Sequence, residues 1–398
     1  MGLWTLLMRL FPLSKANKES LELVNEIFSE SEIKEMKELL KIHKARFSED
    51  DFSTTNGFFK DSKYMTFKSN SVNSKIKERA EFFDRRVSQF GRELLFKAFS
   101  EVAEERILSL IAPNIIGLED VKRAGLFQLF ASEKVHILLL GDPSTGKTVI
   151  LRSIAELAPI SSFGLGSGSS KAGLTVTFSG KEMIKGLLPL ADNGIACIDE
   201  LNLMQNPDRA GLLNAMEKGF ITYDKGNNHI QLEARVKVFA SANPDGDRFI
   251  GRTIEVLKKQ VPFESALLSR FHLVFLIRRP GTDEFLKITD KLIKGGETHI
   301  DEHDRGFVKA YIEYALSKEV SFDKSLSSLI QGFVADVKND EGKFIVEITP
   351  RMVMGIMNMA KARTRLRLRE KVEKEDILAV LKIFNSALYI KKDELAKQ

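Results

Sequence analysis

Short apolar runs alternate with helical periods through the middle of the chain. Near-continuous apolar runs occupy residues 135–140, 195–198 and 236–240, and helical spacing lies between them. Runs of this length are typical of strands that are buried on both faces of a parallel sheet. The pattern therefore predicts an α/β core with a central parallel sheet.

Helical periodicity dominates on both sides of this core. Residues 17–47 and 75–107 carry apolar side chains at three- and four-residue steps, and the pattern after Pro280 is helical almost to the end. We therefore expect three parts. These are a mainly helical N-terminal region at 1–105, the α/β core at 106–279 and a helical domain at 280–398.

Composition narrows the class of protein. The 398 residues include 60 Lys and Arg against 55 Asp and Glu, a net charge of +5, with one cysteine. One cysteine excludes a disulfide framework and a Cys-ligated structural zinc, whereas the slight basic excess permits nucleic-acid binding without requiring it. The apolar stretch at residues 1–8 is too short to span a bilayer, and packing onto the body is favoured over the alternative of an interfacial helix, so we expect no membrane association. The single cysteine fits a reducing cytoplasm best.

A phosphate-binding pattern follows the first predicted strand. Eight residues match G-x-x-x-x-G-K-[ST]; they are Gly141, Asp142, Pro143, Ser144, Thr145, Gly146, Lys147 and Thr148. In such a loop the backbone N–H groups surround phosphate oxygens, the lysine reaches the β- and γ-phosphates, and the Thr148 hydroxyl is a ligand for Mg²⁺. The sequence therefore predicts a site for ATP and Mg²⁺.

Further polar residues follow the other strands. Asp199 can hold Mg²⁺ and Glu200 can polarise the attacking water, the alternative being a surface acidic pair. Asn243 can orient that water, although Asn-Pro is also a common turn pair. Arg270 follows an apolar turn and Arg351 opens a helix. For each arginine the alternative to a nucleotide contact is an ordinary surface position.

In this order, the motifs resemble the AAA+ module of the minichromosome maintenance (MCM) helicases, of archaeal type. The resemblance covers about 106–390 and is carried by four segments, 111–122, 191–200, 240–244 and 267–271. It implies an AAA+ P-loop core, followed by a helical lid, that hydrolyses ATP. It also implies that Arg270 is an arginine finger and Arg351 a sensor 2, both acting on the nucleotide of a neighbouring subunit.

A shared site implies a ring oligomer, which in this family is usually a hexamer. Residues 220–232 read as a hairpin that places Lys225 where the family carries a pore lysine. There it would contact the backbone of single-stranded DNA, whereas without the resemblance it is a solvated lysine. We therefore expect an ATP-dependent DNA helicase or translocase in DNA replication. The alternatives are an ATPase that remodels or regulates a protein complex without unwinding DNA, and a ring subunit that binds ATP without hydrolysing it.

The chain also departs from the family pattern. Asn202 and Leu203 replace the usual Asp-Lys after the acidic pair, and Gly146 to Thr148 replace the usual Ala-Lys-Ser. The family's N-terminal OB-fold and zinc domain is expected to be absent, with 1–105 in its place as the region that binds a replication-protein partner. The basic stretch 361–369 is expected on the surface of a lid helix, with DNA or subunit contact as the alternative.

Overall fold

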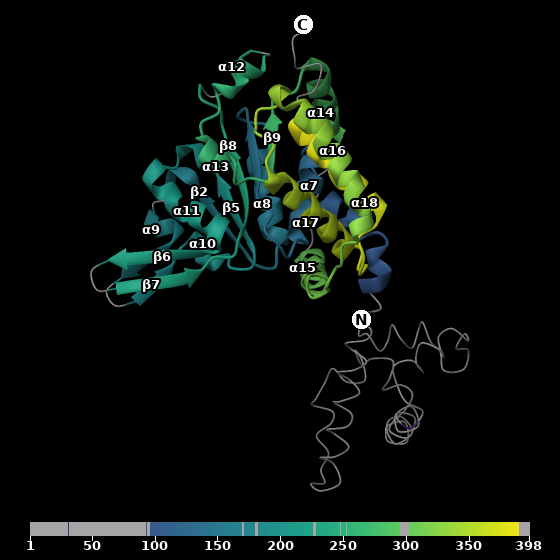
Figure 1. Ribbon diagram of the computed structural model, residues 1–398, viewed down its shortest axis with the longest axis horizontal. Helices are drawn as coiled ribbons and strands as arrows, with labels where there is room; N and C mark the ends of the chain where they lie inside the picture. The colour runs from purple at the N-terminus through teal and green to yellow at the C-terminus, as the bar shows by residue number, and fades with distance from the viewer. Residues whose placement is uncertain are drawn as a thin grey trace. The chain divides into compact units, whose positions relative to one another are not determined.

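The computed structural model describes residues 31, 93, 96–168, 171–179, 182–225, 228–246, 248–251, 253–294 and 302–389 (Figure 1). The chain forms two compact units, Met1–Phe99 and Ser100–Gln398. Most of the predicted helical region 1–105 lies outside the described residues, and the domain boundaries stay predictions. Everything below concerns the second unit. No helix in the described part of the chain is long and apolar enough to cross a membrane.

Five parallel strands form the central sheet, in the order β2-β5-β8-β1-β9. Their bounds are β1 Ile137–Gly141, β2 Ser161–Leu165, β5 Ile195–Asp199, β8 Lys237–Ala242 and β9 Leu273–Ile277. The three strands expected from the apolar runs are β1, β5 and β8, each within two residues of the expected ends. The predicted parallel α/β core is therefore confirmed.

Helices cover both faces of the sheet. In the core they are α6 Ala103–Leu110, α7 Glu119–Leu129, α8 Lys147–Leu157, α9 Lys171–Leu174, α10 Leu187–Leu190, α11 Asn206–Lys218, α12 Ile254–Lys258 and α13 Ser265–Leu268. Figure 1 shows α9, α10 and α11 gathered beside β2 and β5. Two antiparallel hairpins project from this side, β3 Val176–Ser179 with β4 Glu182–Lys185, and β6 Phe220–Lys225 with β7 Asn228–Glu233. The second is the hairpin expected at 220–232.

The chain after Pro280 is helical, as the sequence predicts. Its helices are α14 Thr282–Lys294, α15 Glu302–Leu316, α16 Ser327–Asn339, α17 Pro350–Leu366 and α18 Lys374–Leu388. In this lid region α18 packs against both α17 and the edge strand β9 (Figure 1). The lid therefore lies beside the strand that is paired with β1.

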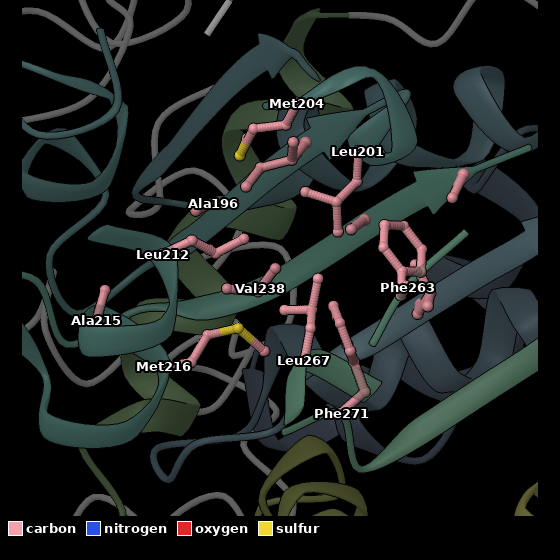
Figure 2. Packing of buried hydrophobic residues seen from close by; sticks show 14 of the residues in the cluster. Ala196, Leu201, Met204, Leu212, Ala215, Met216, Val238, Phe263, Leu267 and Phe271 are labelled. Carbon is pink, nitrogen blue, oxygen red and sulfur yellow. The ribbon is translucent and has the colours of Figure 1, made fainter. Parts of the chain in front are cut away.

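One apolar layer fixes the positions of two segments that matter for the site. Alternate strand residues such as Ala196 and Val238 face a buried cluster that includes Met216 of α11 and Phe271 (Figure 2). These residues are fully or almost fully buried, and burying each large side chain is worth about 1.5–3 kcal/mol. Met216 precedes Glu217 and Phe271 follows Arg270, so the packing holds those two charged residues in place.

The basic stretch 361–369 is not a solvated lid surface. Arg363 is buried and lies 2.7 Å from Asp376 of α18 and 3.1 Å from Glu104 of α6, measured between charged atoms. Arg365 is only 4% exposed and lies 3.3 Å from Glu133. The prediction of a solvent-facing stretch is wrong for these two side chains, because acidic residues far away in the sequence neutralise them.

Candidate functional site

Three neighbouring strands bring the predicted nucleotide residues together. In the sheet β8 lies between β1 and β5, and all three run in the same direction. Their carboxyl ends therefore meet at one edge, which places the 141–148 loop, Asp199 with Glu200, and Asn243 side by side. Ligands of open α/β sheets bind at this edge.

The loop after β1 has the backbone geometry of a phosphate cradle. Gly146 has φ of 87°, a left-handed conformation that favours glycine, and α8 begins at the next residue. A Cβ at Gly146 would come within 2.8 Å of the end of the Ile115 side chain, which would have to shift to make room for it. The loop thus ends at a helix N-terminus, whose N–H groups and dipole suit phosphate oxygens. Its residues fit a nucleoside triphosphate.

Asp142 anchors this loop rather than facing a ligand. Its carboxylate accepts hydrogen bonds from the backbone N–H of Phe249 at 2.7 Å and of Arg279 at 3.0 Å. The side chain is buried. Asp142 therefore joins the loop to the segments that follow β8 and β9, which keeps the cradle rigid.

Lys147 lies inside the cradle. Its ammonium group donates hydrogen bonds to the carbonyl oxygens of Gly141 at 2.7 Å and Asp142 at 2.6 Å, and only 6% of the residue is exposed. Burial lowers the pKa of Lys147 to about 8, and the charges of Asp142, Asp199 and Glu200 oppose this effect. A phosphate group would favour the charged form more strongly than two carbonyl oxygens do.

Ser241 joins the two acidic residues at the end of β5. Its hydroxyl donates a short hydrogen bond to Oδ1 of Asp199 and accepts one from the Glu200 backbone N–H at 3.1 Å. Glu200 has φ of 54°, and a Cβ at Gly166 would overlap the Glu200 carbonyl oxygen. The tight turn therefore needs glycine at 166. Asp199 is buried and Glu200 half-buried, so the two carboxylates differ in access to solvent.

A second hydrogen bond joins the segments that follow β5 and β8. Oδ1 of Asn202 accepts a hydrogen bond from the backbone N–H of Asn243 at 3.0 Å. Asn202 is a position where the sequence departs from the family pattern, and this contact gives it a structural role. Sequence reasoning missed both Ser241 and Asn202 as parts of the site. The polar Ser241 within the apolar β8 run is the one signal that pointed to it.

The residues predicted to hold Mg²⁺ fit that ion. Thr148 is exposed on the first turn of α8, and Asp199 ends β5 at the same edge. Mg²⁺ is usually bound by one or two protein oxygens together with substrate phosphates, and a hydroxyl with a carboxylate suits it. Among the described residues no three His, Cys, Asp or Glu side chains gather as a metal-binding cluster.

A cavity of about 820 Å³ opens beside the phosphate cradle. Ser144, Thr145 and Gly146 form one side, and Asn385, Ser386 and Tyr389 from the end of α18 and the residue after it form another. Apolar side chains such as Ile115, Ile116 and Ile277 lie between them. Cofactor pockets have this size and this mostly apolar lining. The sequence did not identify the lid residues, because they lie more than 200 positions after the loop.

The two predicted arginines lie at the opposite edge of the sheet. Arg270 precedes the amino end of β9, whereas the loop follows the carboxyl end of β1, which is paired with β9. A five-residue strand spans about 13 Å between its end residues. One Nη of Arg270 donates to Oε2 of Glu217 at 2.7 Å, and the other donates to the Ala266 carbonyl oxygen. Arg270 is therefore directed away from its own chain's phosphate cradle.

Arg351 lies near Arg270 at the start of α17. Burial and then the charge of Arg270 lower the pKa of Arg351, while Glu217 opposes them. Lys134 joins this cationic group, because its ammonium donates to the Glu217 carbonyl oxygen at 2.7 Å. The structure thus gathers Arg270 and Arg351 with each other but not with Lys147.

Lys225 ends β6 and is paired in register with Asn228 across the hairpin. Its backbone is in the predicted strand, and its side chain lies outside the described residues. The pore contact of Lys225 stays a prediction.

Comparison with known proteins places this arrangement in a family. Residues 95–294 match the MCM P-loop domain, and residues 306–388 match the MCM AAA-lid domain. DNA replication licensing factor mcm7-B of Xenopus laevis is 29% identical over an alignment of 326 positions, which covers 74% of this chain and 44% of that protein.

Two further relatives match a similar share of this chain. DNA replication licensing factor MCM4 of Drosophila melanogaster is 31% identical over an alignment of 313 positions, which covers 71% of this chain and 36% of that protein. DNA replication licensing factor MCM5 of Arabidopsis thaliana is 28% identical over 329 residues, covering 73% and 45%. The chain spans less than half the length of these relatives. Because the P-loop domain match alone covers half of it and the lid match follows directly, the chain belongs to the MCM family.

Proposed function

We propose that this protein is an ATP-dependent DNA helicase or translocase of MCM type that acts in DNA replication as a ring oligomer, with six subunits expected. One observation carries the proposal. The phosphate cradle lies at one edge of the sheet and Arg270 with Arg351 at the other, so each site is completed by a neighbouring subunit. An enzyme of this kind hydrolyses ATP poorly as a monomer.

Within one subunit the residues have separate roles. The 141–148 backbone and Lys147 bind the phosphates, and Thr148 with Asp199 holds Mg²⁺, which neutralises charge on the phosphates when it is bound. Glu200 polarises the attacking water, and Asn243 orients it. Ser241 fits this assignment, since it ties the carboxylate of Asp199 to the backbone of Glu200.

The neighbouring subunit supplies the cations. Arg270 contacts the transferring phosphoryl group as a finger, and Arg351 acts beside it as sensor 2. The Glu217 carboxylate holds Arg270 at the edge, and the side chain exchanges this partner for a phosphate on assembly. An arginine finger of this type accelerates hydrolysis by about 10³- to 10⁵-fold.

DNA is the proposed substrate of the motor. The hairpin β6–β7 presents Lys225 next to the turn, where a ring of such cations would contact the DNA backbone irrespective of sequence. Relatives named as DNA replication licensing factors support a role in replication. We also propose that residues 1–105 bind a replication-protein partner.

Hydrolysis and strand displacement on forked DNA test the proposal directly, with the full chain assembled on ATP. DNA stimulates hydrolysis in the wild type, and Lys225→Ala reduces the ratio of the rates with and without DNA to about one. Lys258→Ala, at an exposed lysine on α12, keeps this ratio. Glu200→Gln lowers hydrolysis by about 10²-fold or more under both conditions.

A rate of ATP hydrolysis that DNA does not change, together with the absence of strand displacement, would contradict the helicase proposal. That result would favour an ATPase that remodels or regulates a protein complex.

A further inference from the structure

The cavity beside the phosphate cradle has a second wall made by the lid. Ile115 contacts Gly146, so this part of the 114–121 segment borders the phosphate end. Asn385 reaches the cavity from α18, on the lid wall. With the triphosphate held at Lys147, the nucleoside occupies the space between these walls.

Most of the lining does not distinguish one purine base from another. Ile116, Leu118 and Ile288 are apolar side chains, and they contact the faces of adenine and guanine equally well. Discrimination between bases comes from hydrogen bonds to their edges. A polar side chain with unused donors or acceptors is therefore suited to recognise the base edge.

Among the polar side chains on the lid wall, Asn385 meets this requirement most fully. Tyr389 already donates its hydroxyl to Asp340 at 3.0 Å, and Ser386 offers a single hydroxyl. The side chain of Asn385 is exposed and makes no hydrogen bond with any other residue that the structure describes. Its backbone carbonyl accepts a hydrogen bond from the Tyr389 N–H at 3.0 Å, which leaves the carboxamide available for a ligand.

We propose that Asn385 is a specificity-determining residue that selects adenine over guanine; the inference rests on the proposed ATP site. A carboxamide presents one donor and one acceptor side by side. Adenine matches this pair with its 6-amino donor beside the N7 acceptor, whereas guanine presents two acceptors, O6 and N7. With guanine the carboxamide oxygen would face another acceptor.

Nucleotide affinity measured on the full chain tests this assignment. Calorimetric titration of the wild type with ATP, GTP and purine riboside triphosphate, which lacks the 6-amino group, gives ATP a dissociation constant about 10- to 100-fold lower than the others. Asn385→Leu removes the preference: the affinity for ATP falls to that for GTP, and the affinity for GTP stays. Asn385→Ala repeats the measurement with a smaller side chain.

Lys382→Leu is the matched control, because Lys382 is exposed on the same helix α18 and is not among the residues that line the cavity. Its ratio of ATP to GTP affinity stays that of the wild type. An unchanged ratio in Asn385→Leu, or a wild type that binds ATP and GTP equally, overturns the inference and leaves the proposed function intact. A wild type that binds no nucleotide overturns the proposed function itself.

Discussion

At the scale of single residues, Ser241 controls the geometry of the proposed catalytic carboxylates. Its hydroxyl is hydrogen-bonded to both the carboxylate of Asp199 and the backbone N–H of Glu200. Buried polar groups that lose a partner pay their full desolvation cost. A small change at this serine therefore affects both the proposed Mg²⁺ ligand and the residue proposed to polarise the attacking water.

Replacing the hydroxyl tests this role. Ser241→Ala leaves the buried Asp199 carboxylate without its donor, so we expect a loss of about 1–3 kcal/mol in the free energy of unfolding. We also expect a fall of about tenfold or more in kcat, because Glu200 loses its anchor, with little change in nucleotide affinity. Ser241→Thr, which keeps the hydroxyl, restores most of kcat. Full activity in Ser241→Ala would show that the contact is unimportant.

The lowered pKa of Lys147 gives nucleotide binding a pH dependence. The side chain is protonated below about pH 8 and neutral above it, and the phosphates bind the protonated form. Titrations between pH 6 and pH 10 should therefore show constant affinity below about pH 7 and a loss approaching tenfold per unit above about pH 8. Lys147→Arg keeps its charge over this range and removes the dependence, whereas a flat wild-type profile would contradict the assignment.

At the scale of elements, one buried ion network joins α17 to its neighbours. Arg363 lies between Glu104 of α6 and Asp376 of α18, and Asp376 is fully buried. Breaking such a network leaves uncompensated charges in the interior, which is far more costly than losing an exposed pair. The position of α17, which carries Arg351 in its first turn, therefore depends on Arg363.

Two substitutions on the same helix separate buried from exposed pairing. Arg363→Ala should lower the free energy of unfolding by about 3–5 kcal/mol, because Asp376 and Glu104 lose a partner. Lys361→Ala breaks a more exposed pair with Glu133 and should cost about 1 kcal/mol or less. Denaturant unfolding of both variants checks the contrast. Equal losses would mean that the network contributes no more than a surface pair.

The sequence predicted those features of the elements that depend on local pattern. The apolar runs identified β1, β5 and β8, and the G-x-x-x-x-G-K-[ST] spacing identified the loop, because neighbouring residues determine both. The Asn202–Asn243 bond and the Arg363–Glu104 pair join residues 41 and 259 positions apart. Periodicity carries no information about such contacts, and for the same reason the lid wall of the cavity was not predicted.

At the scale of the whole molecule, the two edges of the sheet divide the proposed site between subunits. In the proposed assembly Glu200 acts on the nucleotide of its own subunit, whereas Arg270 acts on that of the next. A variant of either residue therefore lacks a different half of the site. The sharing itself can be measured without a structure of the assembly.

Mixing two inactive variants tests this division. Glu200→Gln and Arg270→Ala should each reduce hydrolysis by about 10²-fold or more. In mixed assemblies some sites combine the intact Glu200 of one subunit with the intact Arg270 of the other, so the mixture regains activity. A mixture of Glu200→Gln with Lys147→Ala is the control, because both lesions lie in the same half. If the mixture of Glu200→Gln with Arg270→Ala regains no more activity than the control mixture, the shared site is contradicted.

Because the cradle and the arginines lie at opposite ends of the strands, each subunit of the proposed assembly has two different contact surfaces. Contacts of this heterologous kind either close into a ring or continue as an open row. In an open row the phosphate cradle at one end has no neighbouring arginines, and the arginines at the other end have no neighbouring cradle. One nucleotide site therefore stays inactive. Closure into a ring gives every cradle a pair of arginines. The rate of ATP hydrolysis per subunit then measures directly whether the ring is closed.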